Sequence, residues 1–517
     1  MTTLPLAETA PMDLNQNRRH FFHTSLAAAS MVPALGSAAD APAQPSRGEH
    51  EPGRKGQANH QTQTLAAFAS GLQFDQIPGE VLKRAKDTLA DTLAVAMFGS
   101  ALPWSRMMTE FAKESGKTGN SQVLGVKGLQ LEPNAAALAN GSFTHAFELD
   151  CLTKPNSGSH PGATVFMPLI ALAQAKQSSG RELLTSFVAG TELMIRVGRA
   201  TQHSQEEHGF HAPGTTGPFG SAAACSRLLG LNAEQTTNAL GLAASMAGGL
   251  LEFAKSGTGA MVKRMHMGRA AQAGVMAAGL AQKGYTGPNT ALEGHFGFMN
   301  VFCPSHDLDQ LTLNLKQDWL TMTTMHKRYA CHITAHTPVE SAVSLKEEHK
   351  FSPEDIAEIT IECNERSMRA NNIPSPKDIL LAQYSVPFCV ALSMYRNPVD
   401  PRSFDDAAVK DPKIMSLSSS IIMKTIAAPD NKSDMTSIVR IKLKNGQEIS
   451  KRSTAFLGTP ERPLDTQALR EKFLMLTVDT SAARGKSRIA QESKQMSAWF
   501  DRIQNIENEK NLNWIKS

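Results

Sequence analysis

The chain has 517 residues, of which 41% are hydrophobic, 19% charged and 6% aromatic, and its net charge at pH 7 is +4. Such a chain can bury a core without disulfide or metal staples and has room for two or three domains. It contains no long basic run and no basic stretch interleaved with aromatic residues, so we expect no nucleic-acid partner. Six scattered cysteines without a C-x-x-C pair argue against a zinc cage, an iron–sulfur cluster and a disulfide framework.

The N-terminus predicts an export signal. Arg18-Arg19 is followed by His20-Phe21-Phe22, a weakly apolar stretch over 25–35 and small residues up to Ala41. This order is typical of a twin-arginine signal over residues 1–41; the alternative is a tail in which the arginine pair occurs by chance. The apolar stretch is too short to span a bilayer. We therefore expect a periplasmic protein with no membrane contact after signal removal, or a cytoplasmic one if the signal is not functional.

A polar linker is predicted over residues 42–63, and a helical domain over 64–321. Its segments are rich in Ala, Leu and Met, and apolar residues recur at helical spacing, as over 81–93, 167–173 and 221–247. Several segments are apolar on every side, which is typical of helices inside a large bundle.

The pattern changes after residue 322. Residues 356–363 alternate like a half-exposed strand, and 437–450 read as a hairpin with a type I′ turn at Asn445-Gly446. We therefore expect a smaller α+β domain over 322–455. Residues 456–517 return to charged helical segments that pack back on the first domain. The predicted fold class is mainly α, with a large helical domain and a smaller α+β lid.

Common cofactor and metal motifs are missing. The chain has no Walker motif, no H-E-x-x-H and no G-x-S-x-G, and its glycine-rich stretch at 214–220 has the wrong spacing for a dinucleotide loop. His332 and His336 have the spacing of two ligands on one helix face, but Pro338 is expected to break that helix before Glu340. We expect no metal ion and no cofactor.

Four polar clusters interrupt the apolar sequence. Each one alone is compatible with a capped helix end or a solvated basic face. Their recurrence in one chain favours a binding site, and the second cluster precedes a small-residue helix whose N-terminus suits an anion. The clusters span residues 140–162, 208–216, 257–268 and 326–332.

These residue types suit one kind of chemistry. Removing a proton next to a carboxylate creates an enediolate-like dianion, which water stabilises poorly. The pairs Lys263-Arg264 and Lys327-Arg328 could stabilise that charge without a metal. Histidines act as acid and base near neutral pH, and a buried lysine beside another cation has a lowered pKa.

At these clusters the sequence resembles the MmgE/PrpD family, whose activities include 2-methylcitrate dehydratase, cis-aconitate decarboxylase and iminodisuccinate epimerase. The resemblance covers roughly residues 62–510 and keeps the family order of motifs. The matching stretches are N-G-S-F-T-H-A-F-E-L-D with S-H-P-G, G-F-H-A-P-G-T-T-G-P-F-G-S-A-A-A, A-M-V-K-R-M-H-M-G, K-R-Y-A-C-H-I-T-A-H and Q-Y-S at Gln383.

The resemblance implies a large helical domain formed by N- and C-terminal segments, an inserted α+β lid, a homodimer and a cofactor-free site between the domains. It implies catalytic residues His160, His211, Lys263, His266, Lys327 and Tyr384, and substrate contacts from Glu148 and Asp150. From their place beside the two lysines, we also expect Arg264 or Arg328 to help bind the carboxylates of the substrate. Two positions depart from the family pattern: Cys151 follows Asp150 where relatives have a second acid, and Glu148 stands where Asp is common.

We therefore expect a cofactor-independent lyase, a dehydratase or decarboxylase, that acts on a small di- or tricarboxylic acid. An epimerase or isomerase using the same carbanion is the alternative. A periplasmic carboxylate-binding protein is a third reading, but a two-lobed receptor would show repeated strand–helix units that this chain lacks.

Overall fold

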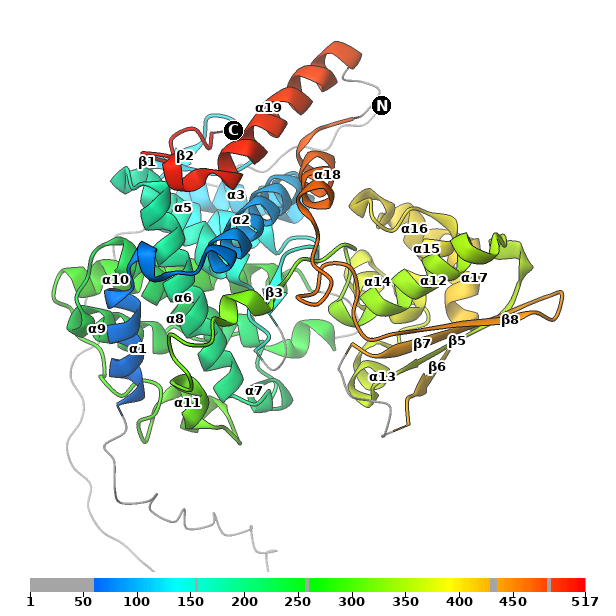
Figure 1. Cartoon of the computed structure of the whole chain (residues 1–517), viewed down its shortest axis with the longest axis horizontal. Coiled ribbons are helices and arrows are strands. Elements are labelled where there is room, and N and C mark those ends of the chain that lie inside the picture. The colour runs from blue at the N-terminus through cyan, green and yellow to red at the C-terminus, as the bar shows by residue number, and fades with distance from the viewer. Residues whose placement is uncertain (1–59, 154–156, 256–259, 428–434, 481–484, 517) are drawn as a thin grey trace, which may run out of the picture. The chain divides into compact units, whose positions relative to one another are not determined.

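Helices make up most of the chain, and a small sheet lies in its C-terminal part (Figure 1). The computed structural model describes residues 60–153, 157–255, 260–427, 435–480 and 485–516. Residues 58–517 form one compact unit. The prediction of a mainly α chain with a small α+β part is confirmed. The predicted export signal and residues 42–59 of the predicted linker lie outside the described residues.

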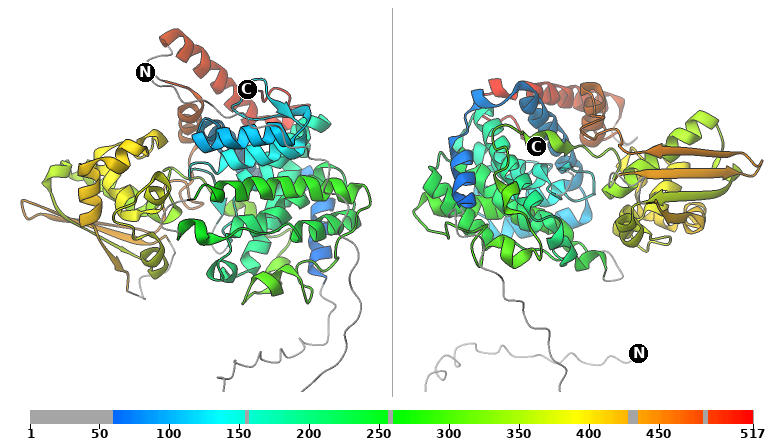
Figure 2. Two further views of the ribbon diagram at one scale, coloured as in Figure 1. Left: turned by 180° about the vertical axis from the view of Figure 1, so that it is seen from behind. Right: turned by 60° about the horizontal axis from the view of Figure 1, so that its bottom comes forward.

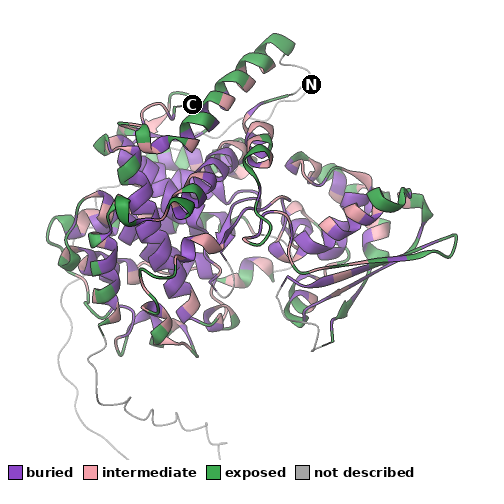
Figure 3. Cartoon of the chain, in the orientation of Figure 1, coloured by how far each residue is buried: buried purple, intermediate pink, exposed green. Residues whose placement is uncertain are grey.

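The helical region, residues 60–325, follows the apolar periodicity of the sequence. Its longest helices are apolar on several sides because neighbouring helices surround them, and buried residues fill the centre of the region in Figure 3. No helix among the described residues is both long and apolar enough to cross a membrane. The helices are α1 (Gln61–Gly71), α2 (Gly79–Ser100), α3 (Pro103–Ser115), α4 (Pro133–Thr144), α5 (Met167–Lys176), α6 (Gly180–Ala200), α7 (Ser204–Glu207), α8 (Ala212–Leu228), α9 (Ala233–Ala244), α10 (Val262–Gln282) and α11 (Phe298–Phe302).

Two short strand pairs interrupt the helices of this region. Strand β1 (Thr118–Gln122) pairs with β2 (Gln130–Leu131), and β3 (Leu152–Thr153) pairs with β4 (Thr324–Met325), both antiparallel. The β3–β4 pair joins the segment after α4 to the segment that carries Lys327. It therefore brings two of the four polar clusters together.

Small residues let α4, α6, α8 and α10 pack closely. A Cβ on Gly268 of α10 would clash with the backbone of α4 at Leu138, and one on Gly274 would clash with Ser221 of α8. Gly190 of α6 meets the backbone of α8 at Gly220 in the same way. These contacts fix the first turns of α8 and α10 beside the end of α4, where the polar residues lie.

The sheet region, residues 336–453, has four strands in the order β6-β5-β7-β8. Strand β5 (Ile356–Cys363) pairs parallel with β6 (Ile422–Thr425) and antiparallel with β7 (Ser437–Leu443), which pairs antiparallel with β8 (Glu448–Ser453). Helix α12 packs against β7 and β8 (Figures 1 and 2). The helices of this region are α12 (His336–His349), α13 (Glu365–Asn371), α14 (Ile379–Tyr384), α15 (Val386–Tyr395), α16 (Asp406–Lys410) and α17 (Pro412–Ser420).

Two local predictions in this region are wrong. The hairpin turn is not type I′, because Asn445 is not among the described residues with positive φ and only Gly446 (φ +90°) adopts the left-handed region. The amide of Gly446 bonds to Leu443 and that of Leu443 to Gln447, so the loop is one residue longer than expected. Pro338 does not break the helix before Glu340: it lies in the first turn of α12, where a missing amide hydrogen costs nothing.

The C-terminal segment returns to the helical region. Helix α18 (Thr466–Thr477) packs on α2, and α19 (Lys486–Gln504) contacts both α18 and α2. Leu469, Phe473 and Leu476 form the buried side of α18. Lys472 lies on this same buried side, so a cation of the C-terminal segment is buried beside the polar residues of the helical region.

Candidate active site

Residues from the four polar clusters converge where α4 ends and α8 and α10 begin. Glu148 and Asp150 lie just after α4, His211 is the N-cap of α8, and Lys263 is in the first turn of α10. Lys327 follows β4 directly. All five side chains are buried, so the alternative of a solvated basic face does not hold for either lysine.

The carboxylate of Glu148 bridges the two lysines. Its Oε1 accepts from Lys263 Nζ, and its Oε2 accepts from Lys327 Nζ at 3.1 Å. Lys327 also donates to the backbone carbonyl of Glu148 at 3.1 Å. Burial, with Lys327 and Arg264 adding repulsion, holds the pKa of Lys263 well below its usual value, and burial also lowers the pKa of Lys327. The Asp150 carboxylate opposes the shift of Lys327 by favouring its ammonium form.

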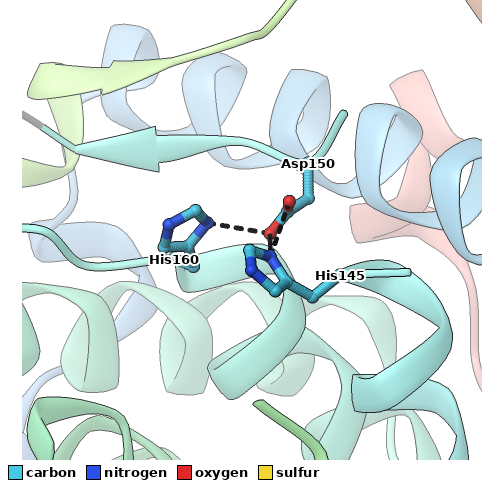
Figure 4. A group of neighbouring side chains, drawn as sticks. All are labelled: His145, Asp150 and His160. Carbon is cyan, nitrogen blue, oxygen red and sulfur yellow. Dashed lines mark hydrogen bonds and ion pairs between the residues drawn. The ribbon is translucent and has the colours of Figure 1, made fainter. Parts of the chain in front are cut away.

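Asp150 holds two imidazoles (Figure 4). Its carboxylate accepts from His145 Nδ1 at 2.9 Å and from His160 Nδ1 at 2.8 Å. Burial alone would raise the pKa of Asp150, but the two histidines outweigh it and hold that pKa well below its usual value. Because an ionised carboxylate only accepts hydrogen bonds, both histidines carry their proton on Nδ1, and their Nε2 atoms are left for other partners.

A second imidazole pair lies beside the first. His211 Nδ1 and His266 Nδ1 are 3.0 Å apart, so one ring donates and the other accepts. Burial and the neighbouring histidines lower the pKa of His211 to about 3, and burial and Lys263 lower that of His266 to about 4. Both rings are therefore neutral near pH 7. The ring centroids of His145 and His211 are 6.2 Å apart, so the two pairs lie next to each other.

Aromatic rings close the other side of Lys263. Its Nζ lies 5.2 Å from the ring centroid of Tyr384 and 5.9 Å from that of Phe253. His332 packs on Tyr384 with ring centroids 4.8 Å apart. Gln383 Nε2 donates to the carbonyls of Phe147 and Ala330, both at 3.0 Å, which fixes the end of α14 against the residues before Glu148.

Arg264 and Arg328 do not join this group in the way the sequence suggested. Arg264 Nε donates to the carbonyl of Ala146 at 2.9 Å, and its guanidinium lies over Trp104, 4.0 Å from the ring centroid. Arg328 lies over Tyr329, 5.9 Å from the ring centroid. The structure thus gathers the other eight predicted residues, Glu148, Asp150, His160, His211, Lys263, His266, Lys327 and Tyr384.

Sequence reasoning missed two residues of the cluster. His145 lies within a quoted motif but was not assigned a role, although its 1% exposure and its bond to Asp150 place it in the site. Lys472 donates to Asp91 at 2.5 Å and to the carbonyl of Lys327 at 2.6 Å. Its signal in the sequence was a lysine three residues after Leu469 and four before Leu476, on the apolar side of a helix.

The donor set of a metal site is present, but hydrogen bonds account for it. His145, Asp150 and His160 have donor atoms within 4.8 Å of one another. Asp150 accepts from both imidazoles at ordinary hydrogen-bond distances, so the three residues form a hydrogen-bonded triad. His332 and His336 contact different groups, the Thr334 hydroxyl and the Tyr329 amide. The absence of a metal remains a prediction.

The cysteines play no cross-linking part. All six are buried and free. Cys151 follows Asp150 and is fully buried, and burial raises the pKa of its thiol well above the usual value. The residue that follows Asp150 is therefore an uncharged side chain.

Comparisons with known proteins match nearly the whole described chain. The family models of the MmgE/PrpD N-terminal and C-terminal domains match residues 63–311 and 329–496. The chain is 28% identical over 427 residues to the cis-aconitate decarboxylase of Homo sapiens, covering 80% of this chain and 86% of that protein. It is 27% identical over 471 residues to the cis-aconitate decarboxylase of Aspergillus terreus, covering 86% and 94%. A cis-aconitate decarboxylase-like protein of Aspergillus oryzae is 32% identical over 301 residues, covering 55% and 61%.

Proposed function

The chain belongs to the MmgE/PrpD family, and on that premise we propose that it is a cofactor-independent lyase that decarboxylates a small unsaturated tricarboxylic acid of the cis-aconitate type. The relatives reported above are named for that reaction, and an enzyme of the lyase type fits them. The observation that carries the proposal is the buried pair Lys263 and Lys327 beside the imidazoles held by Asp150.

The two lysines supply the charge that the reaction needs. Loss of CO2 leaves an electron pair on carbon, which a neighbouring carboxylate delocalises as an enediolate-like dianion. Fixed ammonium groups stabilise this charge more strongly in a buried site than water does, because the local dielectric is low and the groups need not reorganise. Lys263 and Lys327 are 3% and 1% exposed, so they meet this condition.

The histidines supply the proton that replaces CO2. The bond from His160 Nδ1 to Asp150 fixes the ring and directs Nε2 away from the carboxylate. In the proposed reaction an imidazole of this triad, protonated on Nε2 as well as on Nδ1, donates its Nε2 proton to the carbanion carbon, whose electron pair forms the new C–H bond. Tyr384, stacked beside Lys263, orients the acid in the site.

Epimerisation is the second candidate, because two imidazole pairs lie next to each other. A proton removed by the His145–His160 pair could be returned by the His211–His266 pair on the opposite face of the carbon. That reaction uses the same carbanion and breaks no carbon–carbon bond.

Proton NMR in D2O separates these reactions. The purified chain would be incubated with citrate-, aconitate-, methylcitrate- and aminodicarboxylate-type acids. Decarboxylation predicts release of CO2 and one deuterium in the product of an unsaturated tricarboxylic acid. Deuterium exchange with no loss of CO2 or water would instead support an epimerase. Thermal stabilisation without any reaction would support a carboxylate-binding protein.

The resemblance implies a homodimer, and the chain has an exposed apolar surface that would suit a dimer interface. Helices α3 and α10 expose Met107, Phe111, Met261, Val262 and Met265, which line or adjoin an apolar pocket of about 280 Å³. A contiguous apolar surface of this kind is uncommon on a monomer. We propose that a second copy of the chain covers it. Sedimentation equilibrium should give twice the chain mass, and a Phe111→Glu variant should shift the chain to a monomer.

A further inference from the structure

Glu148 occupies an anion site made of two lysines. Each of its carboxylate oxygens meets a different ammonium group, Oε1 with Lys263 and Oε2 with Lys327. All three side chains are at most 5% exposed. A carboxylate of a bound acid would fit the same pair of donors in the same way. The protein therefore fills this place with a side chain of its own.

A buried imidazole nitrogen also faces this position. His145 Nε2 lies 3.8 Å from Glu148 Oε1, is fully buried and has no hydrogen-bond partner among the described residues. Because His145 donates its Nδ1 proton to Asp150, Nε2 can only accept a hydrogen bond, and the ring cannot turn it toward a different partner without losing the bond to Asp150. A buried acceptor without a partner is costly, and an O–H or N–H group brought by a ligand would satisfy it.

The charges around Glu148 disfavour a second carboxylate at the same position. The facing groups are Lys263 from α10, Lys327 after β4, and His145 and Asp150 around the end of α4. Further out, Lys472 of α18 is paired with Asp91 of α2, and the rings of Tyr384 and Phe253 cover Lys263. Two lysines thus balance two carboxylates, and an added anion between the lysines would repel Glu148.

The backbone of Glu148 has an unfavourable conformation. Its φ is +56°, in the left-handed region that residues with a Cβ rarely adopt. Lys327 is bonded to the carbonyl of Glu148 as well as to its side chain, so it stays anchored if the side chain moves. Among the described residues, Lys263 makes no such second bond to this segment. Its ammonium group can therefore bind a ligand when the side chain of Glu148 moves away.

We propose that the side chain of Glu148 takes the place of a substrate carboxylate between Lys263 and Lys327 in the unliganded protein and leaves this place when the acid binds. The inference rests on the proposed function, because it identifies the subsite that receives one carboxylate of the acid. Glu148 then sets the affinity of the site by competition. It is a residue that limits binding and does not itself hold the substrate while ionised.

Isothermal titration with propane-1,2,3-tricarboxylate tests this competition. This acid carries three carboxylates but no double bond, so binding is measured without turnover. Glu148→Gln keeps the shape of the side chain and removes its charge, and we expect it to bind the acid roughly tenfold more tightly than the wild type. Glu148→Asp draws the carboxylate back by one methylene and should also bind more tightly. Asp75→Asn, at a carboxylate whose side chain is 85% exposed, should leave the affinity unchanged.

The outcomes separate this inference from the proposed function. Equal or weaker binding by both Glu148 variants, in a protein whose wild type binds and decarboxylates unsaturated tricarboxylic acids, overturns the inference alone. If Glu148→Gln does not fold, the Glu148→Asp result decides. If the wild type neither binds nor converts any acid of the panel, the proposed function falls and the inference falls with it. A crystal structure with the tricarboxylate should show Lys263 bound to the ligand and not to Glu148.

Discussion

Lys472 donates a 2.6 Å hydrogen bond to the backbone carbonyl of Lys327, although the two residues are 145 positions apart. The same ammonium group pairs with Asp91 of α2 at 2.5 Å and lies 3.3 Å from the carbonyl of Leu149. One side chain from the C-terminal segment therefore ties together α2, the segment after α4 and the segment that carries Lys327. Helix α18 of the C-terminal segment thus helps to hold the candidate site in position.

Replacing Lys472 should destabilise the fold strongly. Lys472→Met removes the partner of Asp91, which is 1% exposed, and an unpaired buried charge costs about 3–5 kcal/mol. Urea unfolding should show this loss. A second change, Asp91→Asn, removes the unpaired charge, so the double variant should recover part of it. A loss below about 1 kcal/mol in Lys472→Met would show that the pair contributes little.

Replacing Lys263 should abolish activity and leave the fold intact. Lys263→Ala removes one of the two ammonium groups that would stabilise the dianion, and loss of such a group lowers kcat by roughly 10²–10³-fold. Circular dichroism would check the fold. Lys113→Ala on exposed α3 is the matched control and should keep full activity. Unchanged turnover in Lys263→Ala would remove the role assigned to this lysine.

Replacing Asp150 should disorder the imidazole pair. Asp150→Asn keeps the size of the side chain but removes the charge that fixes His145 and His160 with their protons on Nδ1. Loss of an orienting carboxylate lowers kcat by up to roughly 10⁴-fold in comparable arrangements, and the pH–rate profile should shift as well. The control is Asp75→Asn, whose side chain is 85% exposed. A normal pH–rate profile in Asp150→Asn would contradict the proposed role of the triad.

Stability should fall as the pH drops below about 6.5. The pKa of His211 is lowered to about 3 and that of His266 to about 4, against 6.5 in the unfolded chain. Between these values the unfolded state binds protons that the folded state does not, so each histidine lowers stability by about 1.4 kcal/mol per pH unit as the pH falls. Denaturant unfolding of the His211→Gln/His266→Gln double variant should show a flatter pH dependence. His295→Gln, at an exposed position, should keep the wild-type slope.

Removing metal ions should not change activity. Hydrogen bonds to Asp150 account for the donor atoms of His145 and His160, so no ion is needed to hold them together. Dialysis against EDTA followed by assay, with elemental analysis of the protein, checks this expectation. Loss of activity that zinc or another divalent ion restores would assign these three residues as a metal site.

Much of the fold followed from the sequence. Helical periodicity predicted α2, α5, α8 and α9, because each helix buries the face that carries its apolar residues. Strict alternation predicted β5 and the β7–β8 hairpin. The predicted turn type is wrong, because the length of that loop depends on how the two strands pair and not on the dipeptide Asn445-Gly446 alone.

The site followed from the sequence only as a set of residues. Motifs identified Glu148, Asp150, Lys263 and Lys327, but not which atoms meet, because the Lys263–Glu148 contact joins positions 115 apart. Tertiary packing decided that Glu148 bridges both lysines, that Arg264 turns to Trp104 and that Lys472 reaches Lys327. Local periodicity and motif spacing are properties of neighbouring residues and can be read along the chain. The charges and hydrogen bonds of this site depend on distances that exist only once α2, α4, α10 and α18 are packed together.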